Sequence, residues 1–172
     1  MRQAFGYGSL VNRGTHPFDC AHRTLQGWRR VWVGTAVRPA AFLSVEPAEG
    51  EIDGLMIDVP DAAWPDLDRR EAHYDRVSLE DGGTIYAVPR RNRSWSDVPI
   101  LRSYLDVVFQ GFEREFGPEG VERFIATTHG WEQGIFDDRA SPIYRRAQDI
   151  SPAETARYDA LLASVPEVEK LE

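Results

Sequence analysis

The sequence is poor in the features that mark several classes of protein. Its one cysteine, Cys20, excludes an internal disulfide, so we expect a reducing, cytoplasmic location. No stretch approaches the roughly 18 apolar residues of a membrane span, and no apolar run near the start is long enough for a signal peptide. The four histidines are scattered, and none has Cys, Asp or Glu at a metal-ligand spacing. We therefore expect no membrane partner and no bound metal.

Basic residues are also in short supply. Lys and Arg together number 20 against 28 Asp and Glu, which gives a formal net charge of -8. A nucleic-acid partner would require a basic face, so this balance argues against one. The common nucleotide-binding motifs are missing too. No Gly-Lys-Ser/Thr follows a glycine-rich loop, and Val11 stands where a dinucleotide fingerprint has its third glycine.

What the sequence does contain is enough apolar residues for one sizeable core. It has 172 residues, of which 42% are hydrophobic, and this fits a single domain over residues 1–172. The first half predicts about six strands and one short helix. The expected strands cover residues 2–7, 25–33, 42–45, 52–59, 74–79 and 84–88. The segments 12–24 and 89–99 are expected to be loops, the second of them rich in arginine and holding Trp95.

The second half predicts helices. Apolar and aromatic residues recur at helical spacing over residues 101–116, and a second, shorter helix is expected around residues 121–125. The run Ser151-Pro152-Ala153-Glu154 has the pattern of a capping box and predicts the start of a last helix. Strands followed by helices indicate an α+β fold, with the helices packed outside a small mixed barrel or sheet.

The stretch at residues 5–10, Phe5-Gly6-Tyr7-Gly8-Ser9-Leu10, is called the glycine loop below. It predicts a short strand that ends in an abrupt turn, because glycine tolerates positive φ and close backbone approach. Successive N–H groups on such a turn can form a concavity that holds an anion. An ordinary turn is the alternative interpretation, since Gly and Ser dominate turns generally.

The short helix expected over residues 64–72 has a carboxylate on its apolar side. Trp64, Leu67 and Glu71 are spaced three and four residues apart and therefore share one face. The other charges nearby are expected to point to solvent: Asp68, Arg69 and Arg70. Glu71 is then either a surface charge paired with an arginine or a carboxylate drawn into the core. In the second case desolvation would raise its pKa.

The glycine loop and the later run Leu67-Asp68-Arg69-Arg70-Glu71, in this order, resemble the signature of the γ-glutamylcyclotransferase superfamily. Residues 27–30 and 42–47 look closest to its glutathione-specific, ChaC-type branch. The resemblance runs from residue 5 to about residue 79, and the helical half fits more loosely through Ser103-Tyr104-Leu105.

This resemblance implies a six-stranded, barrel-like α+β fold and a cofactor-free enzyme. Such an enzyme releases 5-oxoproline from a γ-glutamyl peptide or amine, with glutathione among the candidate substrates. The loop residues that would bind the γ-glutamyl group are Tyr7, Gly8, Ser9 and Leu10. Glu71 matches the catalytic carboxylate, which would act as general acid and base. Tyr104 is added because its hydroxyl could face the same pocket, although core packing is the other interpretation.

Two alternatives from other classes stay open. One is a catalytically silent member of the same fold that binds a small γ-glutamyl or carboxylate ligand as a sensor, and such a protein would not need Glu71. The other is an oligomerisation module that uses the aromatic helix at residues 101–116. Neither the leaving group of the substrate nor the oligomeric state follows from the sequence.

Overall fold

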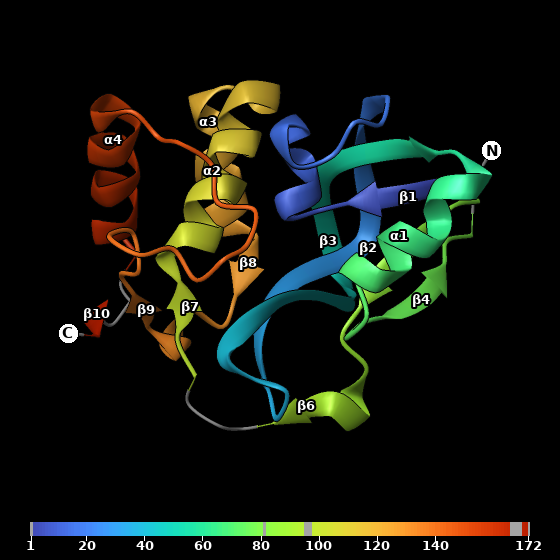
Figure 1. Cartoon of the computed structure of the whole chain (residues 1–172), viewed down its shortest axis with the longest axis horizontal. Helices are drawn as coiled ribbons and strands as arrows, with labels where there is room; N and C mark the ends of the chain where they lie inside the picture. The colour runs from blue at the N-terminus through green and yellow to red at the C-terminus, as the bar shows by residue number, and fades with distance from the viewer. Residues whose placement is uncertain (1, 81, 95–97, 166–169, 172) are drawn as a thin grey trace.

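The computed structural model describes residues 2–80, 82–94, 98–165 and 170–171. A sheet built mostly from the first half of the chain lies beside a group of helices from the second half, as Figure 1 shows with the sheet on the right. This arrangement agrees with the predicted α+β class. Among the described residues, no helix has the length and apolarity needed to cross a bilayer.

The main sheet is mixed and curled, and its path has six strands, the predicted number, in the order β4-β5-β1-β3-β2-β6. The strands are β1 (Arg2–Gly6), β2 (Cys20–Thr35), β3 (Arg38–Val59), β4 (Asp75–Ser78), β5 (Thr84–Ala87) and β6 (Arg93–Ser94). Strand β1 pairs antiparallel with β3 and parallel with β5, and β8 (Thr128–His129) joins β2 beside this path. A second, three-stranded sheet contains β7 (Ile100–Leu101), β9 (Ile135–Phe136) and β10 (Lys170–Leu171).

Some predictions about the sheet were wrong. Residues 20–24 and 93–94 were expected in loops but belong to β2 and β6. Residues 42–45 and 52–59 were expected to be two strands separated by a turn, but they belong to the single long strand β3. Strand β2 pairs with β3 along most of its length, and the register shifts between Gln26 and Trp28, opposite residues 48–50 of β3. Gly50 takes a φ of +117 within the strand. Local turn signals are therefore overridden here by a long partner strand.

The helices agree closely with the periodicity of the sequence. They are α1 (Trp64–Arg70), α2 (Arg102–Phe116), α3 (Pro118–Ala126) and α4 (Pro152–Ala163). The predicted capping box at the start of α4 is formed, because Ser151 Oγ accepts a hydrogen bond from the Glu154 N–H and Glu154 Oε2 accepts one from the Ser151 N–H. Phe109 and Phe112 on α2 are fully buried within the chain. The aromatic face considered for oligomerisation is thus covered by the protein's own residues.

Close backbone approach places the glycine loop against the centre of the sheet. A side chain at Gly54 on β3 would overlap the carbonyl oxygen of Gly6 and the ring of Phe5. Glycine inside a strand often marks such a close approach of another backbone. The core behind it is continuous, since buried residues of β1 and β3 and of α2 and α3 belong to one apolar cluster. The loop is therefore held between the sheet and the helices.

Candidate active site

A pocket of about 320 Å³ lies where β1 and α1 end. The glycine loop forms one wall, and Leu43, Glu71, Tyr74 and Tyr104 are among the residues that complete it. All six residues that the sequence singled out line this one pocket, although they come from three separate parts of the chain. This pocket is therefore the candidate active site.

The glycine loop changes direction through a tight turn. After β1, Gly8 adopts a φ of -133 and a ψ of -125, and residues 9–11 form one turn of 3-10 helix. In that turn the Val11 N–H donates to the Gly8 carbonyl at 2.9 Å. The first N–H groups of a helical turn have no acceptor within it, so they are left for other partners at the pocket wall. A Cβ on Gly8 would lie 2.8 Å from the Tyr104 hydroxyl, which explains why glycine occupies this position.

Glu71 lies directly after the last residue of α1, and its N–H still bonds the carbonyl of Leu67 at 2.9 Å. Trp64 and Leu67 on the same face are buried, as their spacing predicts. The Glu71 side chain is only 14% exposed. Burial raises its pKa above the ordinary value, and the positive charges of Arg70 and Arg146 oppose this effect without cancelling it. The carboxyl group is thus prepared to hold a proton as well as to release one.

The position of Arg70 corrects the sequence analysis, which expected this side chain in solvent. Its side chain is 8% exposed, and Nε lies 3.2 Å from Glu71 Oε1. Its Nη2 donates to Ser9 Oγ at 3.1 Å and its Nη1 to the Thr15 carbonyl at 3.0 Å. The two interpretations of Glu71 are therefore both partly right, because the carboxylate is buried and also paired with an arginine. Helical spacing could not reveal that the glycine loop supplies acceptors for Arg70.

Buried hydroxyl groups surround the pocket. Tyr7 Oη donates to the Tyr86 carbonyl at 2.6 Å, and Tyr74 Oη donates to the Leu43 carbonyl at 2.9 Å. Tyr104 Oη shares a hydrogen bond with the backbone of Ser9. Burial raises the pKa of all three pocket hydroxyls, so they stay neutral at physiological pH. Tyr74 was not singled out from the sequence, although it follows Glu71 by three residues at the start of the predicted hairpin.

A second buried arginine supports the glycine loop from behind. Arg30 on β2 is 1% exposed, and its Nε donates to the Tyr7 carbonyl at 2.9 Å. Its guanidinium lies over the rings of Phe112 and Phe124, with 4.9 Å to each ring centre. Burial lowers its pKa to about 9, so it remains charged at neutral pH.

Arg30 was missed because arginine is rarely buried. A signal was present, since Trp28 and Trp32 stand two residues to either side and share its face of the strand. Two arginines of the segment 89–99 have partners within the protein. Arg91 and Arg93 of that segment form ion pairs with Asp75 and Glu46 of the protein itself. Trp95 of that loop lies outside the described residues.

Comparison with solved structures supports the fold. The chain resembles YkqA from Bacillus subtilis with a TM-score of 0.59 at 16% identity, over 71% of this chain and 52% of that one, so it spans about half the length of YkqA. It resembles uncharacterized protein LOC79017 from Homo sapiens with a TM-score of 0.56 at 16% identity, over 94% and 98% of the two chains. It resembles a gamma-glutamyl cyclotransferase with a TM-score of 0.55 at 14% identity, over 95% and 99%.

Comparison at the level of sequence is more specific. No curated protein matched the chain. The family model for gamma-glutamyl cyclotransferase, AIG2-like, matches residues 4–97, which is more than half of the chain and includes both the glycine loop and Glu71. The finer likeness to the ChaC-type branch stays a prediction. The chain belongs to the AIG2-like gamma-glutamyl cyclotransferase family.

Proposed function

We propose that this protein releases 5-oxoproline from a γ-glutamyl peptide or amine, with glutathione among the candidates, and that Glu71 is the general acid and base. The observation that carries the proposal is the meeting of Glu71 and the glycine loop in one pocket. Membership of the gamma-glutamyl cyclotransferase family supports the same class of reaction.

The reaction needs no nucleophile from the protein. The α-amine of the substrate attacks its own γ-carbonyl carbon, which forms the carbon–nitrogen bond of the five-membered ring. The bond from that carbon to the leaving nitrogen then breaks, and the products are 5-oxoproline and a free amine. Holding the glutamyl group bent supplies proximity, which in well-oriented intramolecular reactions lowers the barrier by about 7–11 kcal/mol.

Three proton transfers accompany these bond changes, and Glu71 would perform two of them. The α-ammonium loses a proton to the carboxylate before or during attack, and the protonated carboxyl group returns a proton to the leaving amine. The attacking nitrogen loses its second proton to water as the amide of the ring forms. A carboxyl group with a raised pKa suits both steps, because neither protonation state is then strongly disfavoured near neutral pH. Arg70 limits the rise in the pKa and so keeps the basic form populated.

The glycine loop would stabilise the negative charge that develops on the γ-carbonyl oxygen. Backbone N–H groups at a tight turn are suitable donors, and removal of one donor from an oxyanion site typically costs about 3 kcal/mol of transition-state stabilisation. Such donors act only if they are held in place. Arg30 holds the loop at the Tyr7 carbonyl, and Arg70 holds it at Ser9 Oγ.

The test is a substrate panel with 5-oxoproline as the measured product. Glutathione, γ-glutamyl amino acids and γ-glutamyl amines are each incubated with the protein and with the variant Glu71→Gln. We expect at least one substrate to turn over, and Glu71→Gln to lower kcat by about 10²–10⁴-fold while the fold and ligand binding are kept. Glu80→Gln, a change at an exposed position, is the matched control.

Two results would contradict the proposal. Normal turnover by Glu71→Gln would remove Glu71 from the mechanism. Binding of γ-glutamyl ligands by the wild-type protein, without release of 5-oxoproline from any of them, would instead favour the silent sensor.

A further inference from the structure

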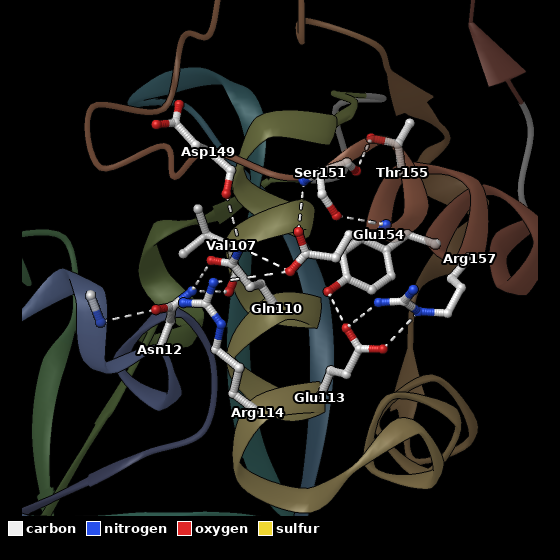
Figure 2. A network of polar contacts seen from close by, with 12 residues as sticks. Asn12, Val107, Gln110, Glu113, Arg114, Asp149, Ser151, Glu154, Thr155 and Arg157 are labelled. Atoms are coloured by element: carbon white, nitrogen blue, oxygen red, sulfur yellow. Dashed lines mark hydrogen bonds and ion pairs between the residues drawn. The ribbon is translucent and has the colours of Figure 1, made fainter.

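The end of the glycine loop is fastened to α2 by a buried amide. Asn12, two residues after Leu10, is 1% exposed. Its Nδ2 donates to the Val107 carbonyl and to Gln110 Oε1, each at 3.0 Å, and its Oδ1 accepts from the Gly14 N–H at 3.0 Å (Figure 2). Both hydrogens and the oxygen of this amide are therefore used, which fixes its orientation.

Gln110 in turn connects α2 to the start of α4. It is fully buried, and its Nε2 donates to the Asp149 carbonyl at 2.9 Å and to Glu154 Oε1 at 3.2 Å. Figure 2 shows this side chain between Asn12 on one side and the start of α4 on the other. At the next residue of α2, Gly111, the helix packs directly against the backbone of Asn12, since a Cβ on Gly111 would lie 2.6 Å from the Asn12 nitrogen.

The residues just before α4 pack against a residue that lines the pocket. Residues 144–149 are called the rim segment below. The Tyr144 ring packs edge-on against the Tyr104 ring with 4.9 Å between their centres, and Tyr104 is the residue whose hydroxyl meets Gly8. A side chain on Gly14 would overlap that of Gln148. Gln110 therefore bonds both to Asn12, two residues after the glycine loop, and to Asp149 in the rim segment.

We propose that Gln110 is a positioning residue for the reaction, which holds the end of the glycine loop, through Asn12, in a fixed position relative to the rim segment. This inference rests on the proposed function. A buried polar network with every member satisfied is rigid, and a displacement of about 1 Å in a catalytic group can cost 10²-fold in rate. Gln110 lies outside the pocket and outside the matched residues 4–97, so neither the family signature nor the pocket lining indicates this role.

Two variants test the hydrogen bonds that Gln110 donates, because they change its donor group while keeping the size of the side chain. In Gln110→Glu the acceptor for Asn12 is kept, but a carboxylate faces the Asp149 carbonyl and the Glu154 carboxylate. In the double variant Gln110→Glu/Glu154→Gln, the amide introduced at position 154 donates to the carboxylate introduced at position 110. Its oxygen still accepts from the Ser151 N–H, so the capping box is preserved. We expect Gln110→Glu to lower kcat by at least 10-fold and the double variant to recover part of the loss, since the Asp149 carbonyl still faces a carboxylate oxygen.

The matched control is the other connection between α2 and α4. Glu113 accepts from Arg157 Nε and from Tyr158 Oη, each at 2.8 Å. Figure 2 shows Glu113 and Arg157 beside the hydrogen bonds of Gln110. This pair joins the same two helices without bonding to the loop. Glu113→Gln should therefore lower the melting temperature but leave kcat and KM unchanged. Equal effects of Gln110→Glu and Glu113→Gln on kcat, measured well below both melting temperatures, would overturn the positioning role.

Hydrogen exchange of the backbone amides gives a second measurement that does not depend on activity. Gln110→Glu should accelerate exchange in peptides that contain residues 8–12, and Glu113→Gln should not. Unchanged exchange of these peptides in Gln110→Glu would overturn the inference even if kcat falls. If the wild-type protein turns over no substrate in the panel, the proposed function fails, and the exchange measurement still decides whether Gln110 holds the loop.

Discussion

The Nε atom of Arg70 lies 3.2 Å from Oε1 of Glu71, although the two residues are neighbours in the chain and both side chains are largely buried. Neighbouring residues of a helix point in different directions. Here α1 ends at Arg70, and Glu71 has left the helical conformation with a φ of -100 and a ψ of 27. The end of the helix thus places a cation directly beside the carboxylate that lines the pocket, where it opposes the rise in the pKa of that carboxylate.

The first prediction concerns this pair. Arg70→Gln should raise the pKa of Glu71, because the nearest charge that opposes burial is removed. Glu71 must be ionised to accept the proton of the substrate ammonium, so the acid limb of kcat/KM should move to higher pH. The pH profile of 5-oxoproline release measures this change. Arg69→Gln is the control, since Arg69 is exposed and pairs with the equally exposed Asp66. A limb that stays in place in Arg70→Gln would show that Glu71 is not the titrating group.

Arg146 on the rim segment should act in the same direction from a greater distance. Its charge also lowers the pKa of Glu71, and the residue is exposed. Arg146→Gln should therefore move the acid limb to higher pH by less than Arg70→Gln does. The effect should shrink as salt is added, because salt screens exposed charges. Arg145→Gln, at the exposed position next to it, should not move the limb. Equal effects of both substitutions would indicate a general influence of net charge.

Stability should depend on pH through Glu71 with the opposite sign to that of an ordinary salt-bridged carboxylate. Burial raises the folded-state pKa above the unfolded value, so the folded protein binds the extra proton between these two values. The free energy of unfolding then falls as pH rises through this window, by about 1.4 kcal/mol for each pH unit that separates the two pKa values. Glu71→Gln removes the free-energy cost of ionising a buried carboxyl group and should raise the melting temperature at pH 7. Thermal melts should show the difference vanishing below the unfolded pKa, and a lower melting temperature at pH 7 would contradict the prediction.

The sequence indicated the site because its two parts have local patterns. The glycines and Ser9 specify a tight turn, and the spacing of Trp64, Leu67 and Glu71 places a carboxylate on an apolar face. Periodicity and the capping box in the same way predicted α2, α3 and α4. Each of these features is set by residues a few positions apart, which is the range that sequence patterns report.

The supporting residues were missed because their partners are distant in the chain. Asn12 and Gln110 are separated by 98 residues, and Arg30 and Thr127 by 97. No local sequence pattern specifies which buried carbonyl or hydroxyl group will accept a hydrogen bond from a buried polar side chain so far away in the chain. The expected turn near Gly50 failed for a related reason, because pairing with β2 decides the conformation there. The glycine loop and the carboxylate of the pocket could thus be predicted from local patterns, and the groups that hold them in place could not.

The last prediction tests how the rim segment is held. Asp138 is 5% exposed, and its carboxylate accepts from the Ser103 N–H at 2.7 Å, from Ser103 Oγ at 2.6 Å and from the Ile143 N–H at 2.8 Å. Ser103 Oγ in turn accepts from the Tyr144 N–H at 3.2 Å. One carboxylate therefore caps the first turn of α2 and fixes the segment that carries Tyr144 to the pocket.

Asp138→Ala leaves buried N–H groups without an acceptor, so it should lower the free energy of unfolding by about 2–4 kcal/mol. Urea denaturation measures this loss, and Asp137→Ala, at an exposed neighbour, should change it far less. Activity adds a second criterion. Below the melting temperature of the variant, Asp138→Ala should also lower kcat, because Tyr144 and hence Tyr104 lose their support. A loss of stability with unchanged kcat would mean that the rim segment does not control the pocket.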